Sequence, residues 1–283
     1  MEADQVTLWN ETVGNAWVEH ADHFDETLQP FGDAAFDRLS LSAGDRVVDI
    51  GCGTGSTTLR IGQHVAPGRV VGVDISAPML AAARARIATA GCSNVEFLEL
   101  DVQESSLGRS EFDAAFSRMG VMFFPEPVRA FTRINESLVE GGRLSFVCFQ
   151  SPQQNPFIVV PVMVAAGRLG VGPPDPTQPN PFSFADPATV TRILQQAGFV
   201  DVVIEPGPTQ GDLGDAHDLP RLAKRLVEQN PSVSPAFAAA TPDARAATVE
   251  AVVEALRPHV VDDHLTMAAA SWVVTARGAH RNG

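Results

Sequence analysis

The stretch that decides the fold of this chain reads Val47-Val48-Asp49-Ile50-Gly51-Cys52-Gly53-Thr54-Gly55. A short apolar strand carries an acid near its end and runs straight into three alternating glycines. Glycines let a backbone turn tightly and approach a ligand where any side chain would clash. The next residues, Ser56-Thr57-Thr58, open a helix. We therefore expect a nucleotide-type ligand at a turn between a strand and a helix.

The glycine turn departs from two common phosphate-binding motifs. A dinucleotide fingerprint favours a third glycine three residues after the second, where this chain has Ser56. A phosphate-binding loop needs Gly-Lys-Ser or Gly-Lys-Thr, and the turn contains no lysine. Taken alone, the turn leaves a nicotinamide or another nucleotide as the ligand.

Two further acids follow the next apolar runs. Asp74 ends the run Val70-Val71-Gly72-Val73-Asp74, and Asp101 follows Phe97-Leu98-Glu99-Leu100. A carboxylate in the first of these places can accept hydrogen bonds from both ribose hydroxyls, and one in the second can accept from the amine of adenine. Since the carboxyl ends of parallel strands meet at one edge of a sheet, all three acids point to a single ligand site.

Working outward, short apolar runs alternate with helical stretches, which predicts a mostly parallel sheet covered on both faces. Ser76 is expected to cap one of these helices, which Gly91 ends, and Gly141-Gly142 is expected to turn the chain into another strand. The expected strands are 46–50, 69–74, 94–100, 112–117 and 143–149, and the expected helices are 57–65, 77–90 and 126–138.

The flanks follow a different pattern. Apolar spacing predicts helices over the first 40 residues, with breaks near Asp22 and at Pro30. The regular alternation stops around Pro152–Pro187, where a short helix near 157–168 is expected. Beyond it we expect a helix over 186–197, a strand over 200–204, helices over 215–257 and a last strand within 265–276.

Together these motifs resemble the class I S-adenosylmethionine-dependent methyltransferases, and in particular the branch of the ubiquinone and menaquinone biosynthesis methyltransferases. The resemblance covers roughly residues 45–149. It rests on Asp49–Gly55, Asp74-Ile75-Ser76, Asp101-Val102, Phe112-Asp113, and Leu138 with Gly141-Gly142-Arg143-Leu144.

The resemblance implies an α/β fold: a Rossmann-like, seven-stranded, mostly parallel sheet whose last strand is antiparallel, with N-terminal helices and a helical cap. Along the chain it implies an N-terminal helical segment (1–40), an S-adenosylmethionine-binding core (41–150), and cap insertions with the last helix and strands of the core (151–283). The cofactor would be S-adenosylmethionine, with S-adenosylhomocysteine as product.

By the same resemblance, the loop of Gly51, Gly53 and Gly55 would cradle the methionyl and ribose parts of the cofactor, and Asp74 would accept from the ribose hydroxyls. Ile75 and Met79 would flank the adenine, while Asp101 and the Val102 amide would read its edge. The expected cofactor-binding residues are Asp49, Gly51, Cys52, Gly53, Gly55, Asp74, Ile75, Met79, Asp101, Val102 and Ser117.

Methyl transfer to a small molecule, with O- or C-methylation preferred, is the function that the resemblance implies. Alignment of the reactants supplies most of such catalysis, and a general base is needed only for a hydroxyl or an acidic carbon. The sequence identifies no catalytic residue; the candidates are His20, His23, Arg118 and His217. A nicotinamide-dependent oxidoreductase and a non-catalytic S-adenosylmethionine-binding protein are the alternatives.

Apolar side chains concentrate around the strand ends and the insertion near Pro152–Pro187. They predict either a flat, lipophilic acceptor such as a quinone-like, phenolic or polyketide metabolite, or a core beneath the cap. The residues are Phe149, Phe157, Phe182, Phe184, Met119, Met122 and Met163.

Composition narrows the partners. A net charge of −14 argues against nucleic acid, and no apolar stretch is long enough for a membrane span. The acidic start Met1-Glu2-Ala3-Asp4 is unlike a signal peptide, and three widely spaced cysteines suit a reducing compartment, so we expect a cytoplasmic protein. We expect no metal, and a homodimer is compatible with the sequence. The acceptor, the methylated atom, the base and the oligomeric state are left open.

Overall fold

A computed structural model describes residues 5–173 and 178–279, which fold into two compact units. The sheet unit contains Pro30–Gln150, Pro179–Gly207 and Ser271–Gly283. The helical unit contains Met1–Gln29, Ser151–Gln178 and Pro208–Ala270. The chain thus passes repeatedly from one unit to the other. This grouping cuts across the division into 1–40, 41–150 and 151–283, which stays a prediction.

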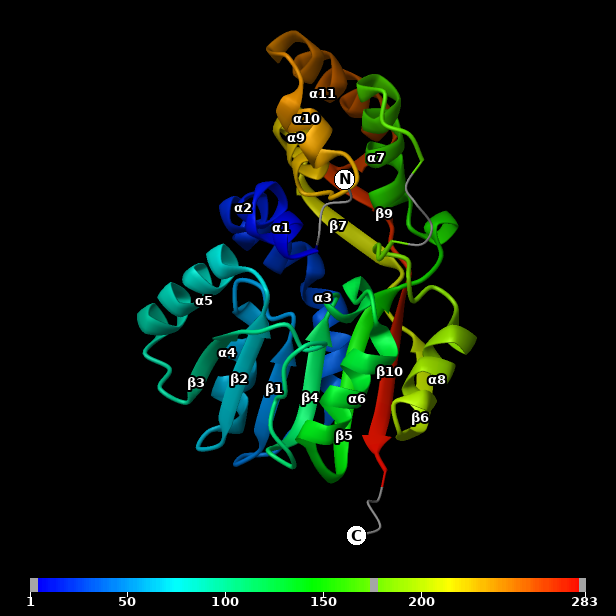
Figure 1. Cartoon of the computed structure of the whole chain (residues 1–283). Coiled ribbons are helices and arrows are strands. Elements are labelled where there is room, and N and C mark those ends of the chain that lie inside the picture. The colour runs from blue at the N-terminus through cyan, green and yellow to red at the C-terminus, as the bar shows by residue number, and fades with distance from the viewer. Residues whose placement is uncertain (1–4, 174–177, 280–283) are drawn as a thin grey trace. The chain divides into compact units, whose positions relative to one another are not determined.

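The sheet unit is built on a seven-stranded sheet in the order β3-β2-β1-β4-β5-β10-β6. Neighbouring strands are parallel except β10, which runs antiparallel to both β5 and β6 (Figure 1). The predicted sheet, including its antiparallel last strand, is confirmed. Its strands are β1 (Arg46–Ile50), β2 (Arg69–Asp74), β3 (Val95–Glu99), β4 (Phe112–Arg118), β5 (Leu138–Phe149), β6 (Phe199–Pro206) and β10 (Ser271–Gly278).

Helices cover this sheet because its central strands are apolar on both faces. In Figure 1, α6 crosses the front of the sheet and the second half of α3 runs behind it, where Ser145 Oγ donates to the Ala35 carbonyl at 2.7 Å. Ser76 caps α5 and Gly91 ends it in the left-handed conformation, as expected. The helices are α4 (Ser56–Val65), α5 (Ala77–Ala90), α6 (Pro127–Ser137), α8 (Pro187–Gln196), the short η1 (Val121–Phe123) and the end of α3 (Ala21–Leu39).

The helical unit contains the remaining helices and a three-stranded sheet in the order β7-β9-β8, which the sequence did not predict. Whether this unit acts as the expected cap stays a prediction. Its elements are α1 (Gln5–Asn10), α2 (Thr12–Glu19), the start of α3, η2 (Pro152–Gln154), α7 (Pro156–Leu169), β7 (Gln210–Asp215), α9 (Leu219–Glu228), α10 (Ser234–Ala239), α11 (Pro242–Leu256), η3 (Arg257–His259), β8 (Val260–Val261) and β9 (His264–Ala268).

Two sequence expectations about the elements were wrong, and a third was confirmed with a different start. Pro30 does not break its helix: α3 continues through it, at the point where the chain passes from one unit to the other. The last strand expected within 265–276 is β10, which begins at Ser271, whereas the residues from Leu265 to Ala268 belong to β9 in the other sheet. Gly141 lies inside β5, where its φ of +69° accommodates an irregular register, so that strand begins at Leu138.

No helix in the two described ranges combines the length and the apolarity that a membrane crossing requires.

Candidate functional site

The glycine turn follows β1 and is closed by the neighbouring strand. The amides of Gly51 and Cys52 both donate to the Val73 carbonyl of β2, at 2.9 and 3.1 Å. Gly51, Gly53 and Gly55 all have positive φ angles, of 65°, 55° and 79°. A side chain is strained in this conformation, which is why the turn needs glycine.

At two of these glycines the neighbouring atoms also leave no room for a side chain. A Cβ on Gly51 would lie 3.0 Å from Gly120 Cα, and one on Gly55 would lie 2.8 Å from Ala83 Cβ. At Gly53, by contrast, the nearest atom to such a Cβ is Met79 Sδ, at 3.8 Å. The middle of the turn is therefore the part that leaves room for a ligand.

Asp49, at the end of β1, is fully buried and only half satisfied. Its Oδ2 accepts hydrogen bonds from the hydroxyls of Thr57 and Thr58, at 2.9 and 2.7 Å. Its Oδ1 is buried and has no hydrogen-bond partner among the residues that the structure describes. Burial raises the pKa of Asp49 to about 6, against the two hydroxyls and the charge of Arg118, which lower it. A cationic or N–H group of a ligand would complete this carboxylate.

Asp74, at the end of β2, is half-buried and holds the turn in place. Its Oδ2 accepts from the Gly53 amide at 2.8 Å, and its Oδ1 from the Ser76 amide at 2.9 Å. Burial raises its pKa, and these backbone hydrogen bonds oppose that shift. A carboxylate has about four lone-pair sites, and three backbone amides (Gly53, Ser76 and Ile75) bond Asp74, so it can still accept from a ligand hydroxyl.

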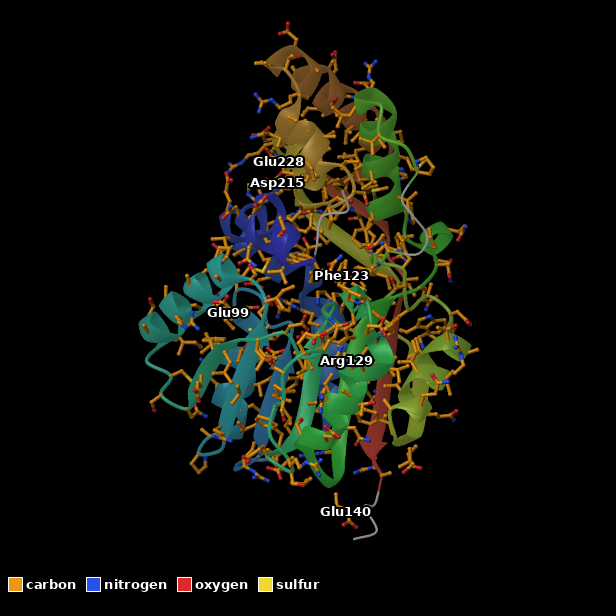
Figure 2. The ribbon with its side chains drawn as sticks, viewed as in Figure 1. Glu99, Phe123, Arg129, Glu140, Asp215 and Glu228 are labelled. Atoms are coloured by element: carbon orange, nitrogen blue, oxygen red, sulfur yellow. The ribbon has the colours of Figure 1, made fainter. Side chains whose placement is uncertain are left out.

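Asp101 lies two residues beyond the end of β3, which stops at Glu99 (labelled in Figure 2). The strand expected over 94–100 therefore ends one residue earlier than predicted. Asp101 Oδ1 accepts from the Gln103 amide at 2.8 Å, and Gln103 Oε1 accepts from the Glu126 amide before α6 at 2.7 Å. The neighbouring Val102 is buried. Asp101 is thus held in an ordered loop after β3.

The end of β4 adds Ser117 and Arg118. The buried Ser117 hydroxyl donates to the Ile50 carbonyl at 2.8 Å, which ties β4 to the end of β1. Arg118 Nη2 donates to Ser56 Oγ, in the first turn of α4, at 3.2 Å. Its side chain passes α3 at Gly32, where a Cβ would lie 2.9 Å from Arg118 Cδ. Arg118 therefore bridges α3 and the start of α4 beside Asp49.

Three other expected residues line or support the turn. Cys52 is buried in a cluster with Leu80, Ala83 and Phe97, and burial raises the pKa of its thiol, so it packs as an apolar residue. Met79 is buried in the first turn of α5, beside Gly53, and Ile75 directly follows Asp74.

The three candidate histidines all lie in the helical unit. His20 follows α2, and its Nε2 is 3.7 Å from Glu228 Oε2. His23 lies on α3, where burial and the charge of Arg225 lower its pKa to about 4. His217 is exposed, with its Nδ1 3.2 Å from Asp215 Oδ1. A pKa near 4 makes His23 a poor general base at neutral pH.

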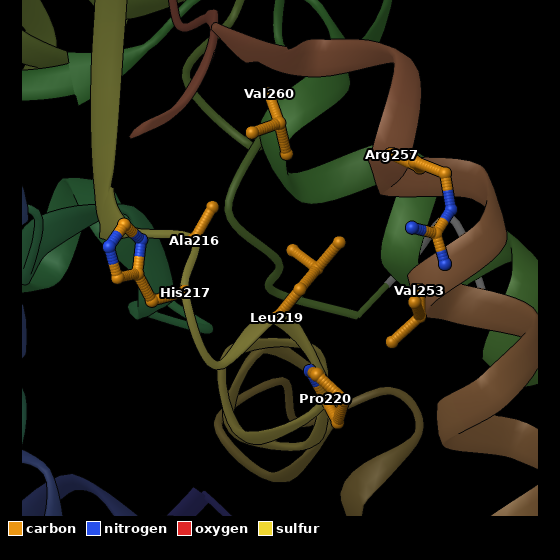
Figure 3. Close-up of a pocket in the computed structure, with 7 residues that line it drawn as sticks. All are labelled: Ala216, His217, Leu219, Pro220, Val253, Arg257 and Val260. Atoms are coloured by element: carbon orange, nitrogen blue, oxygen red, sulfur yellow. The ribbon is translucent and has the colours of Figure 1, made fainter. Parts of the chain in front are cut away.

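A cavity of about 280 Å³ opens near His217 in the helical unit (Figure 3). Its two charged or titratable side chains are already paired, His217 with Asp215 and Arg257 with Glu254. The lining residues are Ala216, His217, Leu219, Pro220, Val253, Arg257 and Val260.

The seven apolar residues singled out in the sequence do not form one group. Phe184 and Met122 are buried in the sheet unit, where the Phe184 ring packs against Phe131 at 6.1 Å. Phe157 is buried in the helical unit, whereas Met163 on α7 is 63% exposed. Phe184 and Met122 therefore belong to the core.

Sequence reasoning missed several residues of the site. Thr57 and Thr58 donate hydrogen bonds to Asp49, and the Gln103 amide donates one to Asp101. Gly120 has no side chain, which lets Gly51 pack closely against it. Only the two threonines had a local signal, since they directly follow the glycine turn. In residues 5–173 and 178–279, no three His, Cys, Asp or Glu side chains gather as metal ligands.

Comparison with known proteins agrees with this geometry. A family model described as "Methyltransferase domain" matches residues 47–142. The aklanonic acid methyltransferase DauC of Streptomyces sp. (strain C5) is 29% identical over 50% of this chain and 67% of its own length. The 2-phytyl-1,4-naphtoquinone methyltransferase of Thermosynechococcus vestitus is 30% identical over 58% of this chain and 76% of its own.

A solved methyltransferase structure shares the fold. A solved phosphoethanolamine N-methyltransferase 2 of Haemonchus contortus, in complex with S-adenosylhomocysteine, superposes with a TM-score of 0.62 at 18% identity. The match covers 99% of this chain, which spans 61% of that chain.

The fold and the acid-lined glycine turn define a nucleoside-cofactor protein of the doubly wound class. Within that class, the chain belongs to the class I S-adenosylmethionine-dependent methyltransferases. The resemblance to the quinone methyltransferase branch is confirmed by relatives with quinone methyltransferase names, and S-adenosylmethionine is the cofactor of the family. The comparisons do not favour a nicotinamide-dependent oxidoreductase.

Proposed function

We propose that this chain transfers the methyl group of S-adenosylmethionine to a small, apolar or aromatic metabolite, at oxygen or carbon. The observation that carries the proposal is Asp49, a buried carboxylate with one unpartnered oxygen beside a turn made of glycines. S-adenosylmethionine supplies an activated methyl group on a sulfonium, together with an ammonium that such a carboxylate can bind. The names of DauC and of the naphtoquinone methyltransferase support an aromatic acceptor.

Each expected site residue has a proposed role that its position supports. Asp49 binds the cationic methionyl part, and the main chain of Gly51, Gly53 and Gly55 lines it, with Cys52 and Ser117 holding the turn. Asp74 accepts from the ribose hydroxyls. Ile75 and Met79 flank the adenine, and Asp101 with the Val102 amide binds its edge.

Catalysis would rest mainly on alignment and exclusion of water, because the leaving group is already activated. His20, His23, Arg118 and His217 stay candidates for orienting or deprotonating the acceptor. His23 is the weakest as a base because of its low pKa, and His217 because it is exposed and paired with Asp215.

The partners, the cellular location and the oligomeric state of the enzyme are also proposals. The net charge of −14 supports an acceptor other than nucleic acid. The three cysteines, which are unpaired, support a location in the cytoplasm. A homodimer would first be sought at the edge strand β6, where Val200 and Val203 are exposed.

The test combines cofactor binding with turnover. Titration calorimetry should show S-adenosylmethionine binding to the wild type and a loss of about tenfold to hundredfold in Asp49→Asn, since a hydrogen bond to a charged group is removed. Asp113→Asn is the matched control. Asp113 pairs with Arg46 where β4 and β1 begin, which is the opposite end of these strands from the glycine turn.

Turnover is then assayed with phenols, quinols and aromatic acids. Methylation of at least one of them supports the proposal. Binding of the cofactor without turnover of any acceptor would instead support a non-catalytic S-adenosylmethionine-binding protein. Turnover of polar sugars or amino acids alone would reject the proposed acceptor class, and tight binding of NADH without S-adenosylmethionine would reject the whole assignment.

A further inference from the structure

The loop that follows β3 offers a hydrogen-bond acceptor and a donor side by side. Among the described residues, the hydrogen bonds donated to the half-buried Asp101 side chain all end on Oδ1, from the amide of Gln103 at 2.8 Å and from its side-chain Nε2 at 3.3 Å. Oδ2 is thus left to accept from a ligand. The adjacent Val102 amide donates to no described residue. Such a pair matches a flat group that carries an N–H donor next to a ring-nitrogen acceptor.

Adenine has such an edge, and hypoxanthine has its reverse. The N6 amine of adenine donates and the neighbouring N1 accepts, whereas hypoxanthine presents a carbonyl acceptor beside an N1–H donor. The Asp101 carboxylate can recognise the amine only while Oδ2 points toward it, and the terminal torsion of an aspartate is broad. Selectivity for adenine therefore needs a contact that holds Asp101 in one orientation.

The side chain of Gln103 supplies this contact. Gln103 is only 8% exposed, and its amide is bonded at both ends. Nε2 donates to Asp101 Oδ1, and Oε1 accepts from the Glu126 amide at 2.7 Å. Glu126 immediately precedes α6, which is anchored in the core of the sheet unit by Phe131. A buried amide bonded at both ends cannot turn without losing a hydrogen bond, so it ties the carboxylate to a fixed helix.

The next residue, Glu104, joins the same loop to α6 without a hydrogen bond to Asp101. Glu104 is exposed, and its two carboxylate oxygens accept from Arg129 of α6 at 2.9 Å each (Arg129 is labelled in Figure 2). A purely structural role, that of fastening the loop to α6, would be common to Gln103 and Glu104. A role in recognising the base would belong to Gln103, which bonds the carboxylate of Asp101.

We propose that Gln103 is a positioning residue: it fixes the orientation of Asp101 and so makes the protein selective for an adenosyl cofactor over an inosyl one. Gln103 acts through Asp101 and does not itself bind the cofactor. The binding of adenine by Asp101 rests on the proposed function, whereas the contacts of Gln103 with Asp101 and Glu126 do not.

The test compares S-adenosylhomocysteine with S-inosylhomocysteine, which differ only at this edge of the base. Titration calorimetry should show the wild type binding the adenosyl compound about a hundredfold more tightly, because hypoxanthine faces both Asp101 and the Val102 amide with the wrong group. Gln103→Leu should reduce that preference about tenfold, since Asp101 can then turn. Glu104→Gln is the matched control, because it removes the exposed ion pair with Arg129, and it should keep the wild-type preference.

Two further variants show whether Gln103 acts through Asp101. Gln103→Glu keeps an oxygen for the Glu126 amide but places a second carboxylate beside Asp101, so its base preference should also fall, by about fivefold or more. This variant decides alone if the thermal transition shows that Gln103→Leu is unfolded. In an Asp101→Ala background, Gln103→Leu should change the remaining preference by less than about twofold, because the group that it positions is gone.

An unchanged base preference in Gln103→Glu, an equal loss in Glu104→Gln, or effects of Gln103→Leu and Asp101→Ala that simply add would each overturn the positioning role. Equal binding of the two compounds by the wild type would overturn it as well, and the binding of S-adenosylhomocysteine would leave the methyltransferase assignment standing. Failure of the wild type to bind S-adenosylhomocysteine would instead reject the proposed function, and with it the role of Asp101.

Discussion

The polar centres of the two units have opposite charge. In the sheet unit, burial raises the pKa of Asp49 to about 6 and also raises that of Asp74. In the helical unit, burial lowers the pKa of His23 to about 4 and also lowers that of Arg225. Desolvation is the largest cause in all four cases, so burial disfavours the charged form of each of these groups.

This difference predicts the kind of group that would complete each centre. In the described part of the chain, the unpartnered oxygen of Asp49 suits a cationic or N–H group, and the unpartnered Nε–H of Arg225 suits a hydrogen-bond acceptor. The two centres also differ in how the chain builds them. The first lies around one continuous stretch, Asp49–Thr58. The second brings the neighbouring helices α2 and α3 together with α9, which lies far along the chain (Trp17 and Gln229 are 212 positions apart).

The largest effect should come from Gly51→Ala, which attacks the glycine turn of the acid-lined centre. A Cβ there adopts a positive φ and would lie 3.0 Å from Gly120 Cα. Gly141→Ala is the control, since its φ is also positive but open space surrounds it. Gly141→Ala should lose about 1–2 kcal/mol in the free energy of unfolding, and Gly51→Ala should lose more because it adds the close contact with Gly120.

Only Gly51→Ala should also lose S-adenosylmethionine binding, by about a hundredfold or more, since the turn itself must shift. Denaturant unfolding and calorimetry measure the two quantities. Retained binding in Gly51→Ala would mean that the turn does not line the cofactor.

An effect of intermediate size is expected in the pH dependence of stability, where the contributions of Asp49 and His23 should change in opposite directions. Asp49 holds its proton more tightly when folded (pKa about 6) than when unfolded (3.8), so its contribution to stability falls as pH rises through that window. His23 holds its proton less tightly when folded (about 4 against 6.5), so its contribution is complete above pH 6.5 and is lost as pH falls toward 4. The groups acting on His23 are Arg225, His20 and Asp212.

Accordingly, Asp49→Asn should gain stability relative to the wild type as pH rises between about 4 and 6, and His23→Gln should lose it over about the same range. Urea unfolding of the ligand-free protein at several pH values measures both slopes. Slopes of the same sign in the two variants would contradict the comparison.

The smallest effect is expected at Gly32, which tests whether Arg118 needs the passage beside α3. Replacing a glycine inside a helix by alanine ordinarily stabilises a protein by about 0.5–1 kcal/mol. Gly167→Ala, on α7 in open space, should show this gain. In Gly32→Ala the new Cβ would lie 2.9 Å from Arg118 Cδ, so the gain should be absent. Thermal unfolding decides, and an equal gain in both variants would show that Arg118 moves freely.

The glycine turn could be predicted in detail because its signals are local. A strand, an acid and three glycines in nine residues admit few backbone paths, and the positive φ angles observed there are the reason for those glycines. The parallel sheet followed from the alternation of apolar runs with helical stretches, whereas its seven strands and antiparallel last strand followed from the family resemblance. The end of β3 was placed too late because Leu100 continues the apolar pattern after the last hydrogen-bonded pair, Asp74 with Glu99.

The sequence by itself determined the parallel sheet, the turn at Asp49–Gly55 and the carboxylates after β1, β2 and β3, because residue type and spacing along one segment decide each of them. Only the tertiary structure decided that Gly120 and Gly32 make room for their neighbours, that 265–276 divides between two sheets, and that His20, His23 and Arg225 share one cluster. Such contacts depend on which distant segments pack together, and burial then sets the charge that each group can keep.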